Sequence, residues 1–176
     1  MKKTISILLV ICMALSVCAC SGGGSDDPQK GSDREEYSPD YGELYYEANG
    51  VKFGIMDYAD EVMEKLPEPS GSFENESCAY QGKDTVYYYD GFELTVHKLD
   101  GDDRIIGVKL TDDTVQTPQG LLIGMSETDC ASVIDGLDGE KTGATVYTVK
   151  AGSTALIVGI GSDATVSSIE FAVISD

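Results

Sequence analysis

Two stretches of the chain carry apolar residues at the spacing of an amphipathic helix, i, i+3, i+4 and i+7. The first is Ala59, Val62, Met63 and Leu66, and the second is Cys130, Val133, Ile134 and Leu137. Asp57 and Ser126 precede them as candidate N-caps. Pro67 and Gly139 follow them as stop signals. We therefore predict two helices, each with one buried stripe.

Strand patterns follow each predicted helix. Phe92, Leu94 and Val96 alternate with Glu93, Thr95 and His97, which is typical of an antiparallel sheet with one wet face. The Asp90-Gly91 dipeptide before them predicts a tight hairpin. The predicted strands are 85–89, 92–99 and 104–111 after the first helix, and 145–150, 154–160 and 166–174 after the second. Both faces of 154–160 are apolar, so its register stays open.

This order predicts an α+β fold of two tandem α-β-β-β repeats, residues 49–113 and 114–176. The strands would form one antiparallel sheet with the helices on one face. The first repeat carries extra residues within 67–84, and we expect them to form a loop that the second repeat lacks.

The N-terminus has the pattern of an export signal. Lys2 and Lys3 precede a mostly apolar run, Ile5 to Ala19, which is shorter than the roughly 20 residues that span a bilayer. The run ends in Val17-Cys18-Ala19-Cys20, which resembles the lipobox of bacterial lipoproteins. The resemblance implies that residues 1–19 are a signal peptide and that Cys20 carries the lipid. The protein would then be extracytoplasmic and anchored to the cell membrane through that lipid.

Residues 20–48 are rich in Gly, Ser, Asp and Glu, which predicts a disordered linker after the lipidated cysteine. The net charge of the whole chain is strongly negative, which limits its partners. The 176 residues hold 31 acidic and 12 basic side chains, a net charge of −19. A chain this acidic repels phosphate backbones, which argues against nucleic acid as a partner.

Few residues suit metal or catalytic chemistry. The chain has one histidine and no tryptophan, which argues against histidine-rich metal sites and most histidine-based catalysis. The acidic turn that begins at Asp100 lacks the glutamate that an EF-hand requires at its twelfth position, because Thr111 stands there. We therefore expect no metal, no cofactor and no enzymatic activity.

The two helix-opening turns, Gly54-Ile55-Met56-Asp57 and Gly124-Met125-Ser126, resemble those of two lipoprotein-associated groups. These are the β-lactamase-inhibitor-protein-like repeats and the outer-membrane assembly lipoproteins of the SmpA/OmlA (BamE-like) type. The segment 77–92 also resembles uncharacterised lipoproteins of clostridial-type bacteria. The resemblance covers about residues 49–176 and implies a protein-binding role rather than catalysis. In the known inhibitors, loops and the concave face of the sheet make the contacts.

Candidate binding residues form two groups. The extra loop contributes Phe73, Tyr80 and Gln81, and the polar side of one hairpin contributes Tyr88, Glu93, Thr95 and His97. Aromatic residues at such places can anchor a partner. A solvated sheet face explains the second group equally, since exposed polar residues on a strand are the default.

Cys78 and Cys130 are the other cysteines of the mature chain. In an exported protein they can form a disulfide. Cys130 also fits a small thiol in the core, because it lies on the apolar stripe of its helix.

Together these features predict a membrane-anchored extracytoplasmic lipoprotein that acts as a non-catalytic protein-binding or envelope-associated module. An inhibitor of a secreted hydrolase and an envelope glycan binder stay open as alternatives.

Overall fold

A computed structural model describes residues 42–174. The predicted signal peptide, the predicted lipidation site Cys20 and most of the predicted linker lie outside this range. Strands make up 46% and helices 11% of the described residues, so the fold is mainly β. Neither helix in this part of the chain combines the length and the apolar character that crossing a membrane requires.

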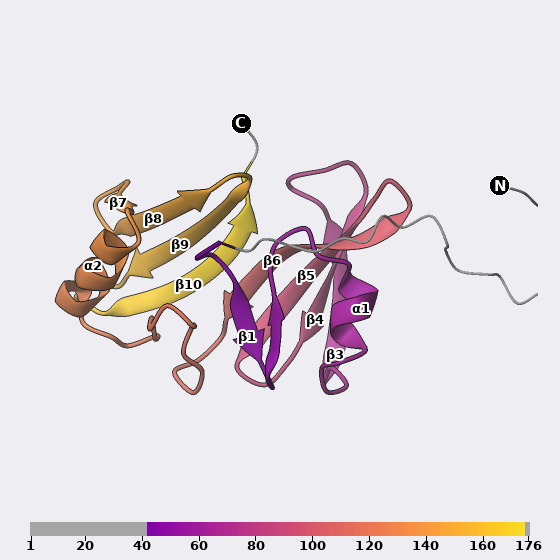
Figure 1. The fold of residues 1–176 in the computed structure, drawn as a ribbon, viewed down its shortest axis with the longest axis horizontal. Helices are drawn as coiled ribbons and strands as arrows, with labels where there is room; N and C mark the ends of the chain where they lie inside the picture. The colour runs from indigo at the N-terminus through magenta and orange to yellow at the C-terminus, as the bar shows by residue number, and fades with distance from the viewer. Residues whose placement is uncertain (1–41, 175–176) are drawn as a thin grey trace, which may run out of the picture. The chain divides into compact units, whose positions relative to one another are not determined.

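An antiparallel sheet of eight strands forms the framework, in the order β3-β4-β5-β6-β10-β9-β8-β7 (Figure 1). The first four strands are β3 (Gly71–Glu76), β4 (Lys83–Tyr88), β5 (Phe92–Leu99) and β6 (Asp102–Leu110). The others are β7 (Glu140–Lys141), β8 (Val146–Ala151), β9 (Thr154–Ile160) and β10 (Val166–Val173). The two groups meet at β6 and β10, where Val108 pairs with Phe171.

A hairpin and two helices complete the fold. The strands β1 (Tyr46–Ala48) and β2 (Val51–Phe53) form a separate two-stranded sheet. Asn49 and Gly50 join them with φ angles of 52° and 76°, which is the backbone of a type I′ turn. The helices are α1 (Ala59–Met63) and α2 (Glu127–Gly136).

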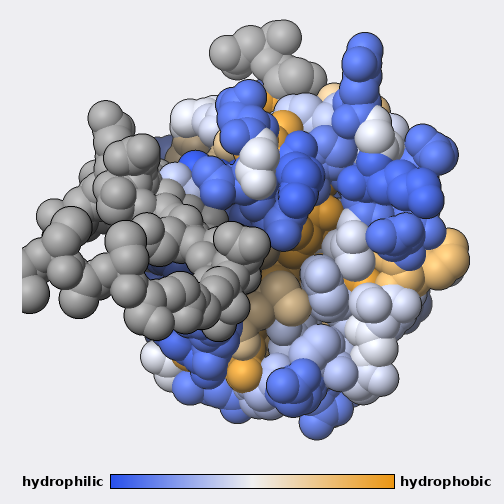
Figure 2. Space-filling model, turned by 90° about the vertical axis from the view of Figure 1, so that its right-hand side faces the viewer, coloured by the Kyte–Doolittle hydropathy of each residue, from blue (hydrophilic) through white to orange (hydrophobic). Residues whose placement is uncertain are grey.

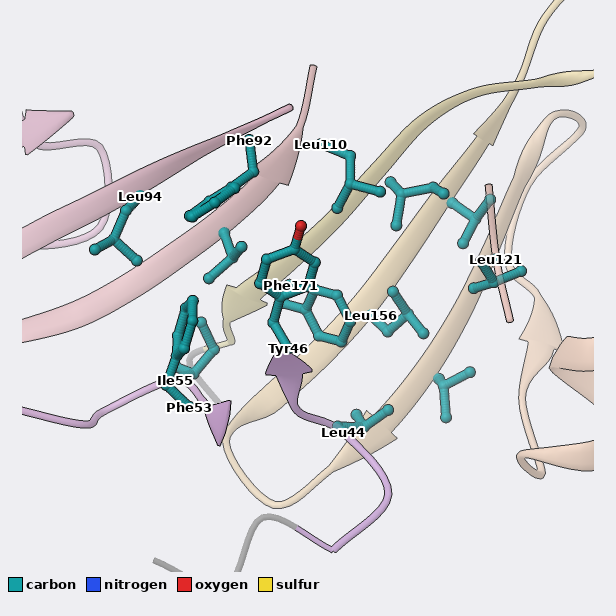
Figure 3. Packing of buried hydrophobic residues seen from close by; sticks show 14 of the residues in the cluster. Leu44, Tyr46, Phe53, Ile55, Phe92, Leu94, Leu110, Leu121, Leu156 and Phe171 are labelled. Carbon is teal, nitrogen blue, oxygen red and sulfur yellow. The ribbon is translucent and has the colours of Figure 1, made fainter. Parts of the chain in front are cut away.

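The core lies between one face of the large sheet and these smaller elements. The ring of Tyr46 is 5.2 Å from Phe92 on β5 and 6.1 Å from Phe171 on β10, measured between centroids (Figure 3). Phe53 packs edge-on against Tyr46 at 5.6 Å. The hairpin therefore connects the two halves of the sheet through buried aromatic contacts, which add to the area that each ring buries.

Backbone hydrogen bonds position both helices. Before α1, the Met56 N–H donates to Ile105 O of β6 at 2.7 Å. Before α2, the Val166 N–H of β10 donates to Met125 O at 2.8 Å. β6 and β10 pair with each other only near Val108 and Phe171. Beyond that point, the segment before α1 pairs with β6, and the segment before α2 pairs with the start of β10.

The α+β prediction, with two tandem α-β-β-β repeats and helices on one face of the sheet, is wrong. The chain is mainly β, it has a second sheet of two strands, and its helices are two short segments. Four strands of the large sheet follow each helix, rather than the three that were predicted. The additional strands are β3 and β7, which lie at the two edges of the sheet. All residues of β3 and β7 are exposed, so neither strand has the apolar alternation that marks a half-buried strand.

Three local predictions also need correction. The residues 67–84, expected as a loop, include β3. Leu44 and Tyr46, assigned to the linker, are buried in the core. Asp57 does not cap α1, because Tyr58 is the N-cap residue and Asp57 Oδ2 accepts a hydrogen bond from the Gly54 N–H. Ser126 does cap α2, with its hydroxyl accepting from the Asp129 N–H.

Candidate binding face

The face of β3, β4 and β5 that points away from the core carries most of the candidate residues. On β5, Leu94 and Val96 point into the core, so Glu93 and Thr95 point to the other side. Directly paired residues of antiparallel strands share a face. Tyr88 pairs with Glu93, Val86 pairs with Thr95, and Phe73 pairs with Val86. We call this set of five residues the outer face.

Two aromatic rings dominate the outer face. Phe73 is 59% exposed and Tyr88 is 36% exposed, and they are the large hydrophobic side chains that stand out to solvent in the described part of the chain. Phe73 lies opposite Val86, two residues before Tyr88, so the rings are diagonal neighbours across two strands. Gly71, the direct partner of Tyr88, has no side chain to cover the tyrosine ring. The two rings therefore form one apolar patch at the edge of the sheet.

His97 lies on the same side of β5 but is buried, with an exposed fraction of 3%. Its Nδ1–H donates to Asp84 Oδ1 on β4 at 2.7 Å, and the ring of Tyr80 stacks on it at 4.9 Å. The prediction that His97 is exposed to solvent is therefore wrong, because the turn between β3 and β4 covers its side chain. In that turn the Ser77 N–H donates to Gly82 O, and the Tyr80 N–H donates to Ser77 Oγ.

This arrangement divides the candidate residues by role. Phe73, Tyr88, Glu93 and Thr95 lie together on the outer face. Tyr80 and His97 form a packed cluster beside it, in which they fix the β3–β4 turn. Gln81 is exposed in that turn. Asp84 and Val86 are not among the candidate residues predicted from the sequence. The alternation of side chains along β4, counted back from Tyr88, places both on the same side as Tyr88.

The outer face continues into a row of alternating charges across the centre of the sheet. Glu93 on β5 pairs with Lys109 on β6, and Lys109 pairs with Glu170 on β10. Opposite charges on directly paired positions stabilise the register of neighbouring strands. The charged row therefore borders the aromatic patch on a rigid surface.

Of the two possibilities left open for Cys78 and Cys130, the structure shows the unbonded one, because both thiols are free. Cys78 is exposed in the β3–β4 turn, whereas Cys130 is fully buried on α2. Burial, with a smaller effect from the charge of Glu127, raises the pKa of the Cys130 thiol. Cys130 is thus a small core residue, which is the other interpretation that its sequence position allows.

Within residues 42–174, no group of three or more His, Cys, Asp or Glu side chains is arranged to hold a metal ion. Two acidic turns use their carboxylates locally instead. Asp112 accepts hydrogen bonds from the hydroxyl and the N–H of Thr114, and these lower the pKa of the Asp112 carboxyl. Asp163 accepts the same pair of bonds from Thr165, with the same effect on its pKa.

Comparisons of the chain with models of protein families, with curated proteins and with solved structures gave no match. The resemblance to the inhibitor-like and SmpA/OmlA-type proteins therefore stays a prediction.

Proposed function

We propose that this protein is an extracytoplasmic lipoprotein, anchored through Cys20, that acts as a non-catalytic protein-binding module. The observation that carries the proposal is the pair of exposed rings, Phe73 and Tyr88, at diagonal positions of neighbouring strands on the outer face. Exposed aromatic residues that can become buried at the centre of an interface supply most of the energy of many protein complexes. The partner would cover these rings and leave Glu93 at the rim.

The regular strand pairing around the aromatic patch favours a binding role for these two exposed rings. Phe73, Val86 and Thr95 lie in one row of regular antiparallel pairs. The buried contact between Asp84 and His97 joins β4 and β5 next to that row. A rigid site loses little conformational entropy when a partner binds, so more of the contact energy appears as affinity.

The charge of the chain indicates what kind of partner this would be. The net charge is −19, and Glu93 lies on the outer face directly opposite Tyr88. Complementary charge accelerates association and selects among partners. A partner with a basic rim around an apolar centre therefore fits best.

An affinity capture tests the proposed binding function. The full chain is immobilised, and solubilised envelope from the source organism is passed over it. A Phe73→Ser, Tyr88→Ser double variant removes the patch, and a Thr145→Ser, Lys150→Ser double variant serves as the matched surface control. We expect one dominant protein on the parent and the control and its loss from the patch variant. Equal retention by all three would contradict the proposed site.

The alternatives predict other results in the same experiment. Retention of polysaccharide without protein would favour an envelope glycan binder, since exposed aromatic rings also stack on sugars. A captured hydrolase that loses activity when bound would make the protein an inhibitor.

The proposed anchor has its own test. Cells that express the chain are grown with radiolabelled palmitate, and the labelled protein is isolated. We expect label on the parent chain and none on the Cys20→Ser variant, whereas Cys18→Ser should keep it. Label on the Cys20→Ser variant would contradict the assigned lipidation site.

A further inference from the structure

A groove separate from the outer face lies between α1 and the core side of β4 and β5. Its volume is about 440 Å³, which is within the range of pockets that hold small organic ligands. A space-filling view of this end of the molecule shows an apolar hollow bordered by hydrophilic residues (Figure 2). The groove is therefore open to solvent and has an apolar interior.

Six apolar side chains line the groove. They are Ala59, Met63, Leu66, Pro69, Tyr87 and Val96. Ala59, Leu66 and Val96 are buried, while Met63, Pro69 and Tyr87 are half-buried and present the remaining accessible surface. A flexible methionine next to an aromatic ring adapts to apolar ligands of different shapes.

The rim of the groove is entirely acidic. It consists of Asp60, Glu64, Glu68 and Asp103, and among the residues that the structure describes no lysine or arginine lines the groove. Asp103 has a long contact of 3.8 Å with Lys98, in which both side chains are more than half exposed. Such an exposed pair contributes little and leaves the rim negative.

We propose that this groove binds a small cationic amphiphile, meaning an apolar body with one ammonium or guanidinium group. The body would displace water from Met63, Leu66 and Tyr87, and the cation would lie between the carboxylates of Glu64 and Glu68. The carboxylates of Glu64 and Glu68 would repel an anionic ligand of the same shape, and a neutral one would gain only the apolar contact. This site is independent of the proposed binding function.

Methionine methyl signals provide a direct measurement. The chain has five methionines, and only Met63 lines the groove. The full chain, carrying Cys20→Ser to prevent lipid attachment, is labelled with ¹³C at the methionine methyl groups and titrated with 4-phenylbutylamine. A Met63→Leu variant assigns the signal. We expect a saturable shift of the Met63 signal and no shift of the Met125 signal, because Met125 lies beside α2.

Matched probes and variants separate charge from apolar contact. We expect 4-phenylbutanol to bind about tenfold more weakly than the amine and 4-phenylbutyrate more weakly still. A Glu64→Gln, Glu68→Gln double variant should bind the amine about fivefold more weakly and the alcohol unchanged. A Glu47→Gln, Glu140→Gln control should match the parent.

Three results would overturn the proposal: no shift at Met63, parallel shifts of Met63 and Met125, or equal affinity for the amine and the acid. A Met63 signal that moves only when a basic protein is added would also overturn it, because the groove would then be part of a protein interface.

Discussion

His97 and Asp84 face each other across β4 and β5, with Nδ1 of the imidazole 2.7 Å from Oδ1 of the carboxylate. The side chains are only 4% and 9% exposed, and the Tyr80 ring covers the imidazole. The chain's single histidine therefore has a structural position, where it ties the β3–β4 turn to the sheet.

Removal of one partner should destabilise the fold, because the other is left buried without its hydrogen bond. We expect His97→Ala to lower the free energy of unfolding by about 3 kcal/mol in urea denaturation. Lys98→Ala, which breaks the exposed contact with Asp103, should cost less than about 1 kcal/mol. A loss at His97 as small as that at Lys98 would show that the buried pair is not a stabilising unit.

Tyr46 should make the stability fall at high pH. Burial, together with the nearby charge of Asp112, raises the pKa of Tyr46 to about 12, against an ordinary value near 10. The unfolded chain therefore loses this proton first, so the stabilisation is complete below pH 10 and is lost as the pH rises toward 12. Urea unfolding across this range should show a loss of about 2 kcal/mol that Tyr46→Phe removes. Tyr88→Phe is the matched control and should keep the loss.

The Ser126 cap should stabilise α2 measurably. Its Oγ accepts a hydrogen bond from the Asp129 N–H at 3.2 Å and donates one to Asp129 Oδ2 at 2.7 Å. We expect Ser126→Ala to cost about 1 kcal/mol in thermal or urea unfolding. Ser132→Ala in the middle of the same helix should cost nothing, since alanine favours helix. Equal effects of the two substitutions would contradict the capping role.

Cys78 and Cys130 should react at different rates with a thiol reagent. Cys78 is exposed, while Cys130 is fully buried and its thiol pKa is raised. With Cys12, Cys18 and Cys20 changed to serine, we expect the native protein to lose its fast-reacting thiol in the Cys78→Ser variant, and Cys130 to react only after urea unfolds the chain. Rapid labelling of Cys130 in the native state would mean that α2 opens readily. A melting temperature that falls on addition of a reductant would instead indicate a disulfide.

The strands that alternate clearly were predictable from the sequence. Phe92, Leu94 and Val96 follow the period of two, and β5 has the predicted bounds. The placement of Tyr88 beside Glu93 follows from the Asp90-Gly91 turn, which sets the register of β4 against β5. This local reasoning placed three of the five residues of the outer face, Tyr88, Glu93 and Thr95, because turn and strand lie next to each other in the sequence.

The β1–β2 hairpin, strand β3 and the burial of His97 could not be predicted from the spacing of apolar residues. The Asn49-Gly50 dipeptide marks the β1–β2 hairpin, but the polar residues before it resemble a linker, and Tyr46 becomes buried only through contacts with distant strands. The exposed strand β3 shows no burial pattern, so its pairing with β4 could not be seen. The burial of His97 depends on Tyr80, whose position is set by the fold of the turn.

The contact between Tyr46 and Phe171 gives the assembly of this domain a fixed order. The first described strand and the last one meet in the same aromatic cluster. When the chain is synthesised from its N-terminus, Tyr46 and Phe53 have no complete surface to cover until β10 arrives. Contacts so distant in sequence form slowly, since the intervening chain must first be brought together. A fragment that stops before residue 166 would lack β10, so Tyr46 could still pack against Phe92 but not against Phe171, and the aromatic cluster would stay partly uncovered.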